Sequence, residues 1–124
     1  MKQSWLNSVS YALQGILEAL KSERNLRIHF SVALLVLLAA VFFQINYLEL
    51  ALVVFAIGFV IVAELLNTAI EKIVDLFQPS YHPLAKTAKN VAAGAVFIAV
   101  LTSVLIGILV FGPYLLDIYR EILM

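Results

Sequence analysis

Long apolar stretches that carry little or no charge dominate this chain. Residues 28–48 and 90–116 contain no Asp, Glu, Lys or Arg, and residues 50–70 contain only Glu64. A membrane-spanning helix needs about 20 mostly apolar residues. The pattern therefore predicts three transmembrane helices, at roughly 30–47, 50–70 and 91–112. Gly112-Pro113 is expected to end the third helix, because proline lacks the N–H that would continue the hydrogen-bond ladder.

The N-terminal stretch has a different pattern. Apolar residues recur at helical spacing from Trp5 to Leu20, whereas polar residues such as Gln14 and Glu18 occupy other positions. This spacing predicts an amphipathic helix at about 4–25 that lies in the membrane interface, with Trp5 as an anchor. Packing against a partner subunit is the alternative interpretation, and the two are compatible. The stretch is too polar for a signal peptide and lacks a cleavage site.

Composition places the chain among small integral membrane proteins. Its 124 residues are 64% hydrophobic and 13% charged, against roughly 45–50% and 25% in soluble domains. The length allows one domain, residues 1–124. Eight Lys and Arg balance eight Asp and Glu without forming a basic stripe, which argues against nucleic-acid binding. The absence of cysteine excludes disulfides and thiolate metal ligands.

The positions of the basic residues predict the orientation in the membrane. Lys and Arg precede the first predicted span and separate the second from the third, whereas the turn at 44–49 has none. Cytoplasmic loops carry an excess of these residues. We therefore expect a multi-pass protein with its N-terminus in the cytoplasm, its C-terminus outside and one cytoplasmic loop between the second and third spans.

One face of the second predicted helix is acidic at its cytoplasmic end. At 100° per residue, Glu64, Thr68, Glu71 and Asp75 lie within a band of about 60°, with Asn67 to one side. An acidic residue inside a span costs roughly 2.5–3.5 kcal/mol on insertion scales and marks a functional site by default. A hard divalent cation such as Mg²⁺ is the natural counter-charge for such oxygen ligands.

A structural interpretation of this acidic face is also open. Arg24, Arg27 and Lys89 lie near the same membrane interface. They would neutralise the carboxylates if the helices formed an ion-pair network. An ion pathway is disfavoured, because the outer halves of the three predicted spans are almost wholly apolar.

Further polar residues flank the first and third predicted spans at the same cytoplasmic interface, and with the acidic face they form one polar layer: Glu23, Arg24, Asn25, Arg27, His29, Tyr81, His82, Lys86, Lys89 and Asn90. The chemistry that suits this layer is phosphoryl transfer at a membrane surface. Such a reaction needs a cation that bridges phosphate oxygens, a Lys on the phosphates and a base near the attacking hydroxyl. Glu64 is the deepest carboxylate and suits a general base. Glu71 and Glu23 are nearer water and suit the metal.

Residues 63–75, Ala-Glu-Leu-Leu-Asn-Thr-Ala-Ile-Glu-Lys-Ile-Val-Asp, resemble the signature of the prokaryotic diacylglycerol kinase family of small three-span lipid kinases. The resemblance extends over most of the chain and includes the runs Glu23-Arg24-Asn25-Leu26-Arg27-Ile28-His29 and Tyr81-His82-Pro83-Leu84-Ala85-Lys86. These two runs look more like the undecaprenol kinase branch than the diacylglycerol kinase branch.

The resemblance implies an all-α integral membrane protein that forms a homotrimer in the bacterial cytoplasmic membrane, with active sites shared between neighbouring subunits. It also implies ATP and Mg²⁺, and a lipid alcohol as substrate, with undecaprenol favoured over diacylglycerol. Glu64 would accept the proton and Asn67 would order the site, while Glu23 and Glu71 would hold Mg²⁺. The residues implied near the nucleotide are Tyr11, Glu23, Glu71, Tyr81, His82, Lys89 and Asn90. Those implied near the lipid are Arg27, His29 and Glu64.

One position departs from the family pattern. The family's Ala-Lys-Asp is Ala88-Lys89-Asn90 in this chain. Asparagine keeps the size and hydrogen-bonding reach of aspartate but loses its charge, so it is neither a base nor a strong metal ligand. The alternative function is therefore a non-catalytic or impaired protein that binds nucleotide or lipid on the same scaffold.

Overall fold

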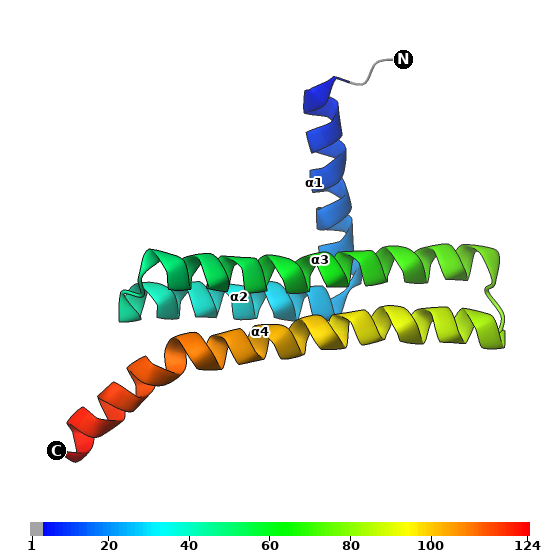
Figure 1. Ribbon diagram of the computed structural model, residues 1–124. Coiled ribbons are helices and arrows are strands. Elements are labelled where there is room, and N and C mark those ends of the chain that lie inside the picture. Colours follow the sequence, from blue (N-terminus) through cyan, green and yellow to red (C-terminus); the bar gives the residue numbers. More distant parts are fainter. Residues whose placement is uncertain (1–3) are drawn as a thin grey trace.

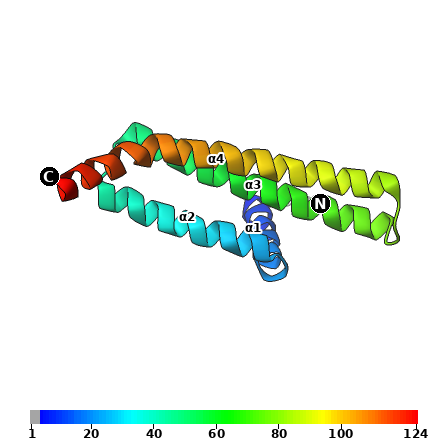
Figure 2. The same ribbon diagram turned by 90° about the horizontal axis from the view of Figure 1, so that it is seen from below.

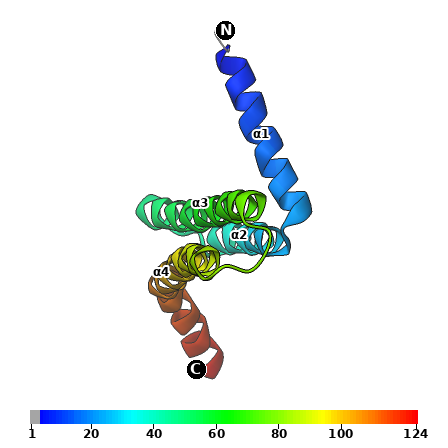
Figure 3. The same ribbon diagram turned by 90° about the vertical axis from the view of Figure 1, so that its right-hand side faces the viewer.

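The computed structural model describes residues 4–124, which form four α-helices and no strand. They are α1 (Trp5–Ser22), α2 (Arg24–Phe43), α3 (Tyr47–Phe77) and α4 (Pro83–Leu123). α2, α3 and α4 lie side by side and antiparallel in sequence order, whereas α1 projects crosswise from them (Figures 1 and 3). The predicted all-α class is confirmed. α1 forms within the predicted range of 4–25, and its place in a membrane interface stays a prediction.

A short turn joins α2 to α3. Gln44 adopts the left-handed conformation (φ 52°, ψ 50°) and stops α2, while Asn46 begins α3 by accepting the Glu49 N–H at 2.8 Å. Asparagine is favoured at this position because its side chain satisfies an amide that lacks a helical partner. The first apolar helix therefore ends at Phe43 instead of residue 47, and Tyr47 already belongs to the next helix.

The expectation that Gly112-Pro113 ends the last helix is wrong, since α4 continues through Pro113 to Leu123. Proline removes one N–H and crowds the preceding turn, so it bends a helix more readily than it ends one when the flanking turns are held. Figure 1 shows the end of α4, orange to red, turning away from α2 and α3. Tyr114 holds the turn after the proline, because its hydroxyl donates to Glu49 Oε1 at 3.0 Å.

Small side chains form the interior of the bundle. Among the described residues, the buried apolar ones are Ala19, Leu26, Ala33, Ala40, Val53, Ala56, Val60, Ala92, Ala99 and Val110. Small residues let helices approach closely where lipid removes the usual hydrophobic drive. α3 packs against α4 along its length, and the Ser103 hydroxyl of α4 donates to the Ala56 carbonyl of α3 at 3.0 Å.

Large apolar side chains cover the outside of the chain instead. Leu34, Phe55 and Leu109 are all more than half exposed. α2, α3 and α4 are each long and apolar enough to cross a membrane. A soluble protein does not leave this much apolar surface in water. The chain is therefore a multi-pass membrane protein.

Candidate active site

A buried carboxylate on α3 faces a histidine on α2. Glu64 is 4% exposed, and its Oε1 lies 3.4 Å from Nε2 of His29. Glu64 and Thr68 are the buried polar residues of the described chain. Burial of an unpaired carboxylate in apolar surroundings costs free energy. The carboxylate is therefore stabilised in the orientation in which it contacts a polar partner.

The unequal lengths of the helices set the depth of this contact. α2 starts at Arg24, about one and a half turns before His29, whereas α3 runs on for another thirteen residues past Glu64, or roughly 20 Å, to Phe77. α1 leaves the bundle where α2 begins, part-way along α3 (Figure 1). Glu64 therefore lies close to the level of the crosswise helix, and the polar end of α3 projects beyond it.

Asn67 and Glu71 meet one turn further along α3. Asn67 Nδ2 donates to Glu71 Oε1 at 3.2 Å. The remaining side-chain oxygen of Asn67, Oδ1, and the hydroxyl of Thr68 are buried without a hydrogen-bond partner among residues 4–124. A buried polar atom left unpaired costs about 1–3 kcal/mol, and each such atom in a folded protein calls for an explanation.

The oxygens at this point fit the divalent cation that the family implies. Asn67 Oδ1 is an unpaired amide oxygen on the residue that bonds the Glu71 carboxylate. Mg²⁺ usually takes one or two carboxylates together with substrate phosphates, and prefers oxygen ligands. Within residues 4–124, no group of three or more His, Asp or Glu side chains is arranged to hold a metal ion. Asn67 Oδ1 and the Glu71 carboxylate are thus the oxygens whose chemistry fits such a cation.

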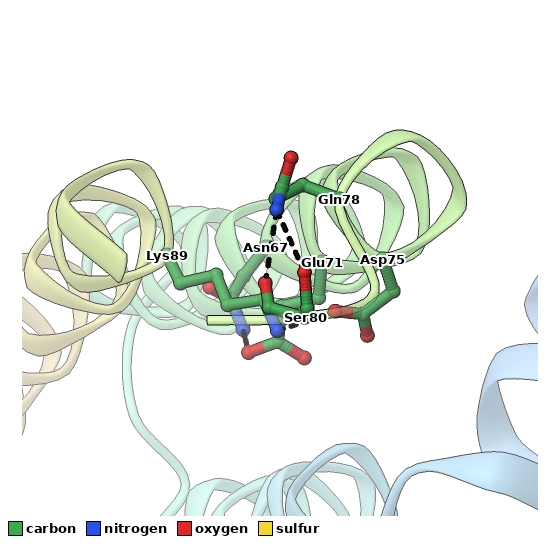
Figure 4. Close-up of polar contacts among 6 residues, drawn as sticks. All are labelled: Asn67, Glu71, Asp75, Gln78, Ser80 and Lys89. Carbon is green, nitrogen blue, oxygen red and sulfur yellow. Dashed lines mark hydrogen bonds and ion pairs between the residues drawn. The ribbon is translucent and has the colours of Figure 1, made fainter. Parts of the chain in front are cut away.

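A cation from α4 reaches the same side of α3. Lys89 Nζ is ion-paired with Asp75 Oδ1, and Figure 4 shows the lysine extending from α4 toward the helix that carries Asn67 and Glu71. The structural interpretation of the acidic face is therefore correct for Asp75. For Arg24 and Arg27, no ion pair forms among the described residues.

Arg27 has a different partner from the one that the sequence suggests. Its Nη1 donates to the carbonyls of Leu20 and Lys21 at 2.7 and 3.0 Å, in the last turn of α1. Those carbonyls have no helical partner of their own, and a cation at a helix C-terminus is favourable. Arg27 thus fixes the crosswise helix to the start of α2. Its role at a lipid head group stays a prediction.

The remaining predicted residues form no side-chain hydrogen bond or ion pair with one another among residues 4–124. Glu23 lies in the junction between α1 and α2, and Tyr11 is exposed on α1. Tyr81 is exposed in the α3–α4 loop. His82 begins α4, and its Nδ1 accepts the Leu84 N–H at 3.1 Å. Asn90 is exposed one position after Lys89.

An apolar groove of about 250 Å³ lies between α2, α3 and α4 and has His29 at one end. Figure 2 shows these three helices from below. The residues that line the groove are His29, Val32, Ala33, Val36, Val53, Ala56, Ile57, Val60, Ile61, Val100, Ser103, Val104, Ile106, Gly107 and Phe111. The α3 part of the wall extends roughly 12 Å along that helix, from Ile61 to Val53. A hydrocarbon chain suits these walls, and the histidine brings the groove to Glu64.

The sequence did not reveal this groove, the cap from Arg27 or the α3–α4 bond from Ser103. Each depends on which faces of two helices meet. The signal that was available for the groove is the row of small residues Ala33, Ala56 and Gly107, which leave room where larger side chains would fill it.

Known proteins identify the family. A model of the prokaryotic diacylglycerol kinase family matches residues 10–111. The undecaprenol kinase of Bacillus subtilis (strain 168) is 40% identical over 111 residues, which cover 90% of each chain. The diacylglycerol kinase of Synechocystis sp. is also 40% identical, over 91% of this chain and 65% of its own length. That of Haemophilus influenzae is 33% identical over 94 residues, 76% of this chain and 80% of the relative. The resemblance in residues 63–75 is thereby confirmed, and this chain belongs to the prokaryotic diacylglycerol kinase family of lipid kinases.

Proposed function

We propose that this protein transfers the γ-phosphoryl group of ATP to the hydroxyl of a membrane lipid alcohol at the cytoplasmic interface, with undecaprenol favoured over diacylglycerol. The observation that carries the proposal is the buried carboxylate of Glu64 in contact with His29, the residue that lines one end of the apolar groove. The groove would hold the hydrocarbon chain and so present the hydroxyl to Glu64. A positioned base of this kind contributes about 10²–10⁴-fold to a reaction rate.

The other polar residues would bind the metal ion and the nucleotide. Glu71 and Glu23 would hold Mg²⁺, which would supply positive charge to offset that of the ATP phosphates. Asn67 orients the Glu71 carboxylate by the hydrogen bond to its Oε1. Lys89 would contact the ATP phosphates, with Tyr11, Tyr81, His82 and Asn90 around the nucleotide.

The preference for undecaprenol rests on the run from Glu23 to His29. This run resembles the undecaprenol kinase branch, and His29 is the member of it that contacts Glu64. Identity alone does not separate the two substrates, since relatives named for either one are 40% identical to this chain.

We also infer a homotrimer in the bacterial inner membrane, with the N-terminus in the cytoplasm and the C-terminus outside. Exposed apolar side chains on α2, α3 and α4 favour further packing, and Ala93 and Ala95 lie exposed beside the buried Ala92. An incomplete set of metal ligands in one chain fits a site that neighbouring subunits share. Native mass spectrometry from detergent tests the oligomer, and a monomer that turns over lipid contradicts it.

The decisive experiment is an ATP-consumption assay on the purified protein in mixed micelles with Mg²⁺, with undecaprenol, diacylglycerol or no added lipid. We expect lipid-dependent turnover that is higher with undecaprenol. Glu64→Gln should lower kcat by about 10²–10⁴-fold. Glu121→Gln is the control, since Glu121 is exposed near the end of α4, far from Glu64 in the sequence. Turnover that persists in Glu64→Gln would remove Glu64 from the role of base.

Asn90, which replaces the Asp of the family pattern, supports a second candidate function. In this candidate the protein binds nucleotide or lipid without turnover. If the lost charge impairs the site, Asn90→Asp should raise kcat, whereas ATP binding by the unmodified protein should be intact. Turnover by the natural protein with either lipid argues against this candidate.

A further inference from the structure

His29 contacts the carboxylate of the proposed base, and a role at the lipid head group alone does not explain that contact. Among residues 4–124, His29 is the only basic side chain within 4.0 Å of the Glu64 carboxylate. The glutamate side chain is 5% exposed and the histidine side chain 21%. The imidazole thus contacts one carboxylate oxygen, Oε1, inside the bundle, and the second oxygen, Oε2, has no ion-pair partner there.

A carboxylate that acts as a base must be oriented toward the hydroxyl whose proton it accepts. Glutamate has several rotatable bonds, and an uncontrolled rotamer would place the accepting oxygen away from the hydroxyl. Catalytic bases are commonly oriented by a third group. The distance of 3.4 Å is long for a hydrogen bond. Contacts of this kind are often long before substrate binds and shorten in the productive complex.

We propose that His29 is a positioning residue for the base. Its Nε2–H holds Oε1 of Glu64, which leaves Oε2 to receive the hydroxyl proton of the lipid alcohol. In the same step the lipid oxygen bonds to the γ-phosphorus, and the bond from that phosphorus to the β–γ bridging oxygen breaks, with its electron pair leaving on ADP. This inference rests on the proposed function and assigns His29 to the base, whereas the family resemblance places it at the lipid.

Two substitutions of the same chemistry separate the roles. In His29→Gln, the amide nitrogen falls near the position of Nε2 and still reaches Oε1. In His29→Asn, the side chain is one methylene shorter and does not reach it. We expect His29→Asn to lower kcat by about tenfold or more, with the KM for ATP and for lipid changed less than about twofold. His29→Gln should recover most of that loss.

A double mutant with Glu64→Gln distinguishes positioning of the base from a purely structural role of His29. In a Glu64→Gln background, where the base is absent, His29→Asn should cause little further loss. Ser31→Ala is the control on the same helix, because its hydroxyl bonds only the Arg27 carbonyl of its own turn among the described residues. Thermal unfolding in detergent verifies that each variant is folded.

Three results would overturn the inference. One is an unchanged kcat in His29→Asn, and another is a raised lipid KM with kcat intact, which would return His29 to the lipid. The third is a loss that adds fully to that of Glu64→Gln. Failure of the proposed function is distinct from these results, since the natural protein would then turn over neither lipid, and both proposals would fall together.

Discussion

Lys89, in the second turn of α4, is ion-paired with Asp75 in the last turn of α3. The cation that the family resemblance assigns to the ATP phosphates is thus held by a carboxylate in this structure (Figure 4). The two side chains are 38% and 59% exposed. A pair so open to water contributes about 0–1 kcal/mol, so the exchange of Lys89 from the carboxylate to a phosphate costs little.

Asp75→Asn therefore tests competition for Lys89. Loss of the competing charge should lower the KM for ATP by about two- to fivefold and leave kcat unchanged, because a pair of this kind is worth at most about 1 kcal/mol. Steady-state kinetics over a range of ATP concentrations measures the effect, with Asp117→Asn at the far end of α4 as the control. A raised KM would mean that Asp75 instead holds Lys89 in place for the nucleotide.

Glu71→Gln tests the assignment of the metal. The amide still accepts a hydrogen bond from Asn67 but no longer carries the charge that a divalent cation requires. We expect the Mg²⁺ concentration for half-maximal turnover to rise by about tenfold or more, which corresponds to roughly 1.4 kcal/mol. The control is Glu18→Gln on the exposed surface of α1. An unchanged response to Mg²⁺ would leave Glu71 with a structural role only.

Arg27→Leu tests the link between α1 and α2. The change removes both hydrogen bonds to the last turn of α1, at Leu20 and Lys21. A cation at a helix C-terminus contributes about 0.3–1 kcal/mol, so the junction should open several-fold more often. Hydrogen exchange at residues 20–24 should become faster by that factor, while exchange in α4 stays the same. If exchange is unchanged and only the KM for lipid rises, Arg27 acts on the head group instead.

Ser103→Ala tests the packing of α3 on α4. The Ser103 hydroxyl crosses to the Ala56 carbonyl, whereas that of the neighbouring Thr102 bonds Ile98 within α4. Interhelical hydrogen bonds in membrane proteins are worth about 0.6 kcal/mol on average and up to about 1.7 kcal/mol. Unfolding by denaturing detergent should show a loss in this range for Ser103→Ala and a smaller one for Thr102→Ala. Equal losses would mean that the contact between the two helices adds nothing.

The acidic face of α3 was predictable because it depends on a single helix. Helical spacing places Glu64 and Thr68 on one side of α3, and both are buried in the structure. The spacing does not say what they face. The partner of Glu64 comes from α2, thirty-five positions earlier, and periodicity contains no information on which helix packs there.

Pro113 shows where a local rule was insufficient. The missing N–H and the crowding by the ring are correct local effects, and they bend α4. Whether a helix then ends depends on what holds the next turn. Here the Tyr114 hydroxyl bonds Glu49 at the start of α3, sixty-five positions away in the sequence. That contact exists only once α3 and α4 are packed.

The sequence by itself determined the apolar helices, their class and the acidic side of α3, because hydrophobic length and helical period act within one segment of chain. It also carried the family, through the run at 63–75. Only the tertiary structure decided that His29 meets Glu64, that Asp75 holds Lys89 and that Arg27 caps α1. These pairings follow from the relative rotation and register of neighbouring helices, which the packing of small residues such as Ala33, Ala56 and Ala99 fixes in space.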